Sequence, residues 1–141
     1  MRFMMLVKAT SASEQSAMPT DEAIARMGRY NEELMKAGVL LDLAGLQATS
    51  KGARITFKGD KKTVVDGPFA ESKELIAGYW IIQVRSREEA LEWAMRAPNP
   101  APDGMDGEIE LRQFFELEDF GDGPAVAAAK ERFKDLAASR K

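Results

Sequence analysis

The 141-residue sequence contains no cysteine and no histidine. The lack of cysteine excludes disulfide bonds, thiolate nucleophiles and cysteine-ligated metals. The lack of histidine removes the side chain that most often serves as a general base at neutral pH and as a metal ligand. The sequence also has no phosphate-binding glycine loop, no zinc motif and no EF-hand loop. We therefore expect no cofactor and no metal, and any catalysis would depend on carboxylates, Lys, Tyr or backbone groups.

An excess of positive charge and long hydrophobic runs are missing as well. Lys and Arg together number 20, Asp and Glu number 23, and the net charge is -3. No basic stripe interleaved with aromatic residues compensates for this, so we expect no nucleic-acid partner. The N-terminal apolar run in MRFMMLVKAT is too short for a signal peptide or a membrane span. We expect a cytoplasmic protein without a membrane partner.

The hydrophobic pattern predicts four strands. Segments 2–8 and 75–84 are apolar on both alternating faces, which is typical of central strands that are covered on two sides. Segment 53–58 alternates, with Ile55 and Phe57 predicted to point inward, and this favours an edge strand. Segment 108–117 is the last predicted strand. We interpret 39–47 as an extended connection.

Helix signals separate these strands. Thr20 is a predicted N-cap, and Gly38 ends the helix that it begins. Ser86 and Glu89 form a predicted capping box at the start of a second helix. Pro124 begins a helix in the tail, whose apolar line includes Val126, Phe133 and Leu136.

The element order predicts an α+β fold: a ferredoxin-like, split βαβ sheet with an extra C-terminal helix. Two helices can cover only one face of this sheet. The other face needs cover from the tail helix or from a second copy, and we favour a homodimer in which two sheets close a dimeric α/β barrel. We expect a barrel domain over 1–121 and a helical extension over 122–141.

Four stretches carry a resemblance to a known family: 45–57, 64–84, 86–100 and 108–121. They resemble the YCII-related (YciI-like) family, and more narrowly its branch named for the motif DGPFAETKE, which reads DGPFAESKE here. The resemblance implies a dimeric α/β barrel. In some relatives a His-Asp pair is proposed as catalytic, with the Asp in the DGP motif. Asp66 matches that Asp, but this chain has no histidine. Some relatives are encoded near sigma factors, which implies a regulatory setting.

The candidate site residues are Asp66, Glu71, Lys73, Glu74 and Arg112. Asp66 could accept a proton or a hydrogen bond in a pocket, or its only role could be to form a turn with Gly67 and Pro68. The charges at 71, 73 and 74 could bind a ligand or form a solvated cluster. Arg112 could hold an anion, or it could pair with neighbouring glutamates.

Two hypotheses of function follow from these candidates. The favoured one is a small-molecule-binding or regulatory homodimer whose ligand is a small anion, bound by Glu71, Lys73, Glu74 and Arg112. The alternative is a cofactor-free lyase or isomerase in which Asp66 is the acid or base. A base would be partly buried beside open pocket volume, whereas a turn residue would not.

Overall fold

The computed structural model describes residues 1–70 and 74–139. These residues form a mixed α+β fold with an antiparallel sheet and helices, consistent with the ferredoxin-like fold. The elements, in chain order, are β1 (Arg2–Lys8), α1 (Ser11–Glu14), α2 (Asp21–Lys36), β2 (Leu40–Gly45), the 3-10 turn η1 (Thr49–Lys51), β3 (Ala53–Lys58), β4 (Lys61–Asp66), β5 (Ile76–Gln83), α3 (Arg87–Arg96), β6 (Ile109–Gln113), the 3-10 turn η3 (Leu117–Phe120) and α4 (Pro124–Ser139).

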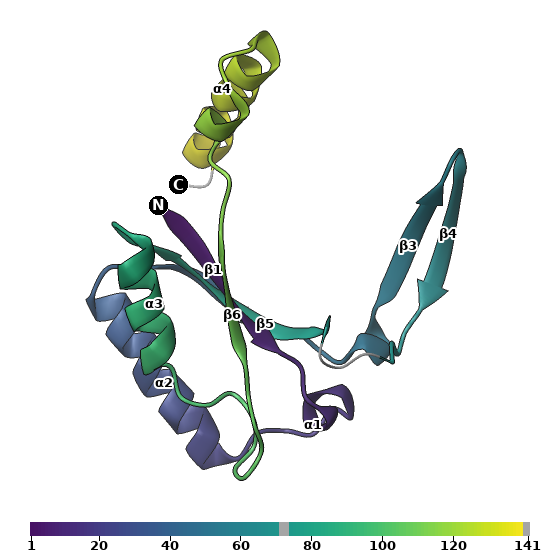
Figure 1. Cartoon of the computed structure of the whole chain (residues 1–141), viewed down its shortest axis with the longest axis vertical. Helices are drawn as coiled ribbons and strands as arrows, with labels where there is room; N and C mark the ends of the chain where they lie inside the picture. Colours follow the sequence, from purple (N-terminus) through teal and green to yellow (C-terminus); the bar gives the residue numbers. More distant parts are fainter. Residues whose placement is uncertain (71–73, 140–141) are drawn as a thin grey trace.

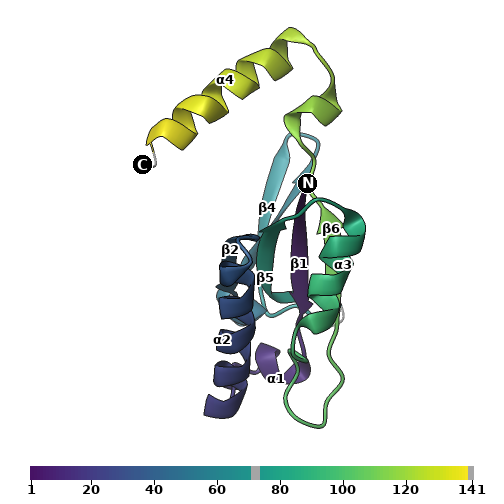
Figure 2. The same ribbon diagram turned by 90° about the vertical axis from the view of Figure 1, so that its left-hand side faces the viewer.

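The main sheet has four strands in the order β2-β5-β1-β6, and neighbouring strands are antiparallel. The two strands predicted to be central, β1 and β5, are central. Both long core helices, α2 and α3, lie on one face of this sheet (Figures 1 and 2). Phe3, Met5 and Ile82 point toward these helices and are almost fully buried, together with Leu34 of α2. The core therefore lies between the sheet and these two helices.

The polar groups in this core have partners. Trp80 Nε1 donates a hydrogen bond of 2.7 Å to Asn31 Oδ1, and Tyr30 donates one of 2.6 Å to the carbonyl oxygen of Trp93. The Tyr30 and Trp80 rings meet edge to face, with centroids 5.4 Å apart. Asn31 thus occupies an otherwise apolar helix face because the buried indole N–H needs an acceptor.

The predicted helix ends are present. Thr20 Oγ1 accepts from Ala23 N, and Ser86 Oγ accepts from Glu89 N. Gly38 follows α2 with a φ of 73°, the left-handed conformation that favours glycine. Between β1 and α2 lies the short helix α1, which begins with a capping box between Thr10 and Ser13.

The prediction for the second strand of the sheet is wrong. Segment 39–47, interpreted as a connection, supplies the edge strand β2, whereas 53–58 pairs only with 61–66 as a separate two-stranded hairpin. Ile55 and Phe57, expected to point inward, are 58% and 71% exposed. The alternating pattern predicts the strand β3 correctly, but alternation does not specify which sheet a strand joins.

The last strand is shorter than expected. β6 ends at Gln113, and Phe115 lies beyond it, exposed, in contact with Phe120. The tail helix α4 forms as predicted from Pro124, but it stands apart from the sheet (Figures 1 and 2). The apolar line of the tail helix was expected to dock on its own or the partner subunit. Phe133 and Leu136 are exposed, so they do not dock on their own subunit, and docking on a partner stays a prediction.

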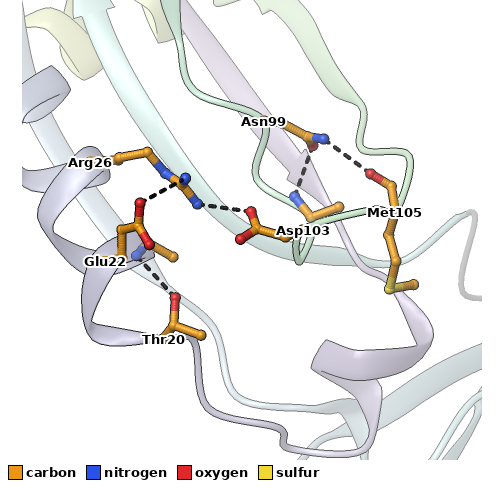
Figure 3. A network of polar contacts seen from close by, with 8 residues as sticks. Thr20, Glu22, Arg26, Asn99, Asp103 and Met105 are labelled. Carbon is orange, nitrogen blue, oxygen red and sulfur yellow. Dashed lines mark hydrogen bonds and ion pairs between the residues drawn. The ribbon is translucent and has the colours of Figure 1, made fainter.

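The loop between α3 and β6 is held against the start of α2 (Figure 3). Arg26 of α2 bonds to Asp103 at 3.1 Å and lies 3.8 Å from Glu22. Within the loop, Asn99 donates to the Met105 carbonyl and accepts from the amide of Ala101. These contacts fix one end of the helix layer.

Within the described residues, no helix has the length and hydrophobicity needed to span a membrane. Over the same residues, Asp and Glu side chains do not gather in any group of three or more that could hold a metal ion.

Candidate functional site

The turn Asp66-Gly67-Pro68 lies at the base of the β3–β4 hairpin. Asp66 is opposite Ala53, and the Gly67 amide donates to the Gly52 carbonyl. A Cβ atom at position 67 would overlap the Thr49 carbonyl oxygen, so only glycine fits against η1 here. The Gly67–Pro68 peptide bond is cis. The DGPF motif, residues 66–69, therefore joins the hairpin to η1.

Thr49 is the centre of the contacts around this turn. Its hydroxyl donates to Glu14 Oε2 at 2.5 Å, and its amide donates to Glu14 Oε1 at 3.0 Å. The same hydroxyl oxygen accepts from the Phe69 amide at 3.0 Å. Glu14 and Thr49 are both half-buried. A carboxylate that accepts two hydrogen bonds from one residue is strongly oriented, so Glu14 connects α1 to the motif.

Phe69 of the motif contacts the hairpin as well as η1. The Arg54 guanidinium carbon lies 3.8 Å from the centre of the Phe69 ring, within the range of a cation–π contact. Arg54 belongs to β3, so this contact links the motif to the first strand of the hairpin. No motif of the sequence marks Glu14, Thr49 or Arg54. Each is an ordinary polar residue that lies distant from the motif in sequence.

The predicted site residues are not gathered into one place. Asp66 is exposed at the end of β4, and Glu74 is exposed just before β5. Arg112 lies on β6, opposite Met4 of β1. Glu71 and Lys73 fall outside the described residues. Among the described residues, no hydrogen bond or ion pair joins Asp66 or Glu74 to Arg112.

Arg112 belongs to the sheet face that points away from α2 and α3. Direct strand pairing places Met4 beside Ile81, and Leu6 beside Tyr79, on this face. All four are half-buried. On β2, Asp42 is opposite Ile81, and its carboxylate accepts from the Tyr79 hydroxyl at 3.4 Å. The open face thus has an apolar centre with polar groups at both edges.

The β6 side of this open face carries three charges in a row. Lys8 Nζ lies 3.1 Å from Glu110 Oε1, and Arg112 lies 3.3 Å from Glu110 Oε2. The hydrogen bond from Lys8, followed by that from Arg112, lowers the pKa of Glu110 below its ordinary value. The Arg112 side chain is nevertheless 72% exposed. The guanidinium of Arg112 is therefore positively charged and accessible from solvent although it pairs with Glu110.

A groove of about 590 Å³ lies elsewhere, between α3 and β6. Its lining includes Leu91, Met95, Ile109 and Glu108, but not Asp66, Glu74 or Arg112. It lies on the helix side of the sheet, so it does not coincide with the residues that the sequence indicated.

Comparison with known proteins shows similarity in both sequence and structure. A model of the YCII-related domain matches residues 1–117, which include the main sheet, both core helices and the hairpin but not α4. An uncharacterized protein of Rhizobium meliloti (strain 1021) is 33% identical over 93 residues, 65% of this chain and 73% of that protein. Among solved structures, the chain is similar to 5-chloro-2-hydroxyhydroquinone dehydrochlorinase from Burkholderia phenoliruptrix AC1100 in complex with 2,5-dihydroxybenzoquinone. That similarity has a TM-score of 0.42 and 13% identity, covering 86% of this chain and all of the other.

Proposed function

The chain belongs to the YCII-related family, and we propose that it acts as a homodimer that binds a small anion between two facing sheets. The observation that carries this proposal is the composition of the open sheet face. Met4, Leu6 and Ile81 form its apolar centre, while α2 and α3 both lie on the opposite face. A mostly apolar floor with a few convergent polar groups is typical of small-molecule sites.

We propose that the sheet of a second subunit packs on this face and buries it. Burial of apolar surface contributes about 25 cal/mol per Å², and packed sheets lie about 10 Å apart. The exposed Leu46 follows the edge strand β2 and would add to the same interface. A symmetric dimer would convert two open faces into one enclosed layer, as in a dimeric α/β barrel.

Arg112 is the residue that we propose for the anion. A guanidinium has five N–H donors in a planar fork, and Glu110 engages Arg112 through one nitrogen. A carboxylate or phosphate could form a bidentate contact with the remaining donors. Tyr79, two strands away on the same face, offers a hydroxyl. Glu71, Lys73 and Glu74 remain proposed contacts from the segment before β5.

The acid–base alternative receives less support from the geometry of the single subunit. A general base works best when it is partly buried beside the reacting group. Asp66 is exposed at the base of the hairpin. We therefore assign Asp66 to the turn at the base of the hairpin, and we propose binding in preference to catalysis.

A thermal-shift panel of small anions (inorganic phosphate, benzoate, pyruvate and succinate) tests the binding proposal. A ligand at 100 times its Kd adds about 2.7 kcal/mol of stability, which raises Tm by roughly 5–10 °C. We expect Arg112→Gln to abolish the shift. The matched control Arg29→Gln lies on α2, on the other side of the sheet, and should keep it. Equal shifts in both variants would contradict the role of Arg112.

Sedimentation equilibrium tests the dimer separately. We expect a dimer at micromolar concentrations of the full chain. A monomer across that range would overturn the facing-sheet arrangement, whatever the ligand panel shows.

A further inference from the structure

The β3–β4 hairpin, residues 53–66, is called the arm here. Every residue of its two strands is exposed. Pairing places Ile55 opposite Val64 and Phe57 opposite Lys62, so one face of the arm is mainly apolar. An isolated two-stranded hairpin is marginally stable in water, and a projecting apolar face marks an interaction site.

The arm is also basic. Its four cations, Arg54, Lys58, Lys61 and Lys62, outnumber Asp60 and Asp66 and give a net charge of +2. Lys62 lies 5.7 Å from the centre of the Phe57 ring, beside the apolar face. A partner surface should therefore combine exposed apolar side chains with carboxylates.

The same chain carries such a surface on the segment 101–123. This acidic segment contains eight carboxylates and only Arg112 as a cation, a net charge of -7. Arg2, Lys8, Arg26 and Lys130 pair with four of the carboxylates, which leaves a net charge of -3.

Two exposed rings lie within the acidic segment. Phe115 is 71% exposed and Phe120 is 60% exposed, and their centroids are 5.0 Å apart. Glu116, Glu118 and Asp119 lie between them in sequence. Glu116 and Glu118 are already in ion pairs within the chain, and the segment keeps a negative net charge. It therefore complements the arm both in its exposed apolar rings and in the sign of its charge.

The tail helix is a less suitable contact surface for the arm than the acidic segment is. Residues 124–141 have a net charge of +3, so a contact between the tail and the arm would bring like charges together. The arm also stands on the side of the main sheet opposite α2 and α3, away from α4 (Figure 1). That is the side on which the proposed second subunit would pack.

We infer that the arm of each subunit clasps the partner, with Ile55, Phe57 and Val64 covering the partner's aromatic pair and Lys62, on the same face of the arm, facing its carboxylates. This inference rests on the proposed dimer. A six-residue strand is about 20 Å long, twice the spacing of about 10 Å between packed sheets, so the arm can extend past the partner's sheet. Two-fold symmetry makes the contact reciprocal, so each dimer would contain it twice.

Cross-linking tests the contact directly, because the chain has no native cysteine. The variant Phe57→Cys/Phe120→Cys should form a covalent dimer with a short bis-maleimide. The matched control is Thr56→Cys/Phe120→Cys, whose first cysteine lies on the other face of the arm. All three positions are exposed, so folding should not be affected. We expect a covalent dimer from the first variant and little from the control.

The outcomes separate this inference from the dimer itself. If the wild-type chain sediments as a dimer and neither variant cross-links, or both do equally, the arm contact is wrong and the facing-sheet dimer stands. If the wild-type chain is a monomer, both are overturned.

A charge exchange provides a second test. Lys62→Glu should raise the dimer dissociation constant about tenfold at low salt, and adding Glu118→Lys to the same chain should restore it. Lys36→Glu on α2 makes the same charge change on the helix side and should have little effect. The inference fails if Lys62→Glu weakens the dimer no more than Lys36→Glu does.

Discussion

The backbone at Gly67 packs directly against the carbonyl oxygen of Thr49. This contact joins the turn that follows the hairpin to η1, which precedes it, and so closes the base of the arm. The Thr49 side chain extends the same junction to Glu14 and to the Phe69 amide. The DGPF motif is therefore, first of all, the part of the chain that anchors the hairpin.

Gly67→Ala should destabilise the protein by about 2–4 kcal/mol, because the new methyl group can fit only if backbone moves. Urea unfolding measures this change. Gly28→Ala is the control. Apart from its chain neighbours and the nearby backbone of its own helix, no atom lies within 4 Å of a Cβ there, and alanine in a helix interior should stabilise by roughly 0.5–1 kcal/mol. Similar free energies of unfolding for the two variants would contradict the close packing at Gly67.

Thr49→Val keeps the shape of the side chain and removes its hydroxyl. The Glu14 carboxylate would lose one donor and the Phe69 amide its acceptor, so we expect a loss of about 1–3 kcal/mol. Hydrogen exchange at the Phe69 amide should also become faster. Thr63→Val on the exposed arm is the matched control and should change stability by less than about 0.5 kcal/mol. Unchanged exchange at Phe69 would show that the Thr49 hydroxyl does not hold the motif.

Alkaline pH should destabilise the fold through Tyr30. Burial raises the pKa of the Tyr30 phenol to about 12 from its ordinary value of 10.0. The folded state thus holds this proton more tightly than the unfolded state does. The full contribution of Tyr30 to the free energy of unfolding is therefore present below pH 10. It is lost as the pH rises from 10 to 12, by roughly 2–3 kcal/mol.

Tyr30→Phe tests this dependence. The variant should cost about 1–2 kcal/mol at pH 7, because the Trp93 carbonyl loses its donor, and it should lose less stability than the wild type between pH 10 and 12. Denaturant unfolding at each pH provides the comparison. If the free energy of unfolding falls equally between pH 10 and 12 in both proteins, groups other than Tyr30 cause the pH dependence.

The tail should matter mainly in the assembled protein. Phe133 and Leu136 are exposed in the single chain, where the contacts of α4 are with η3, including the ion pair between Lys130 and Glu118 at 3.5 Å. We predict that residues 1–121 fold without the tail. Removing residues 122–141 should lower Tm by an amount that grows with protein concentration, as expected if the tail docks on a partner. A decrease in Tm that does not depend on protein concentration would contradict docking of the tail on a partner. An unchanged Tm would indicate that the tail makes no stabilising contact.

Several local features were predictable because their signals are short-range. Thr20 and Ser86 cap helices, since their oxygens reach amides three residues away. A glycine inside a strand signals a bulge or a close backbone approach. Gly78 has both, because a Cβ there would lie 2.9 Å from the Ala44 carbonyl oxygen and the β1–β5 register shifts beside it. The candidate site was less predictable, since Glu14 and Thr49 are 35 positions apart in the chain.

The sequence by itself determined the helices α2, α3 and α4 and the strands β1, β3 and β5, that β1 and β5 lie in the centre of the sheet, and that the chain is a YCII-related protein. Hydrophobic periodicity and capping are properties of neighbouring residues, so they can be read along the chain. Only the tertiary structure decided that β2 forms the sheet edge, that residues 53–66 leave the sheet as an arm, and that Asp66 and Arg112 lie apart. Strand pairing depends on contacts between distant segments, and a pattern of alternation is compatible with more than one partner strand.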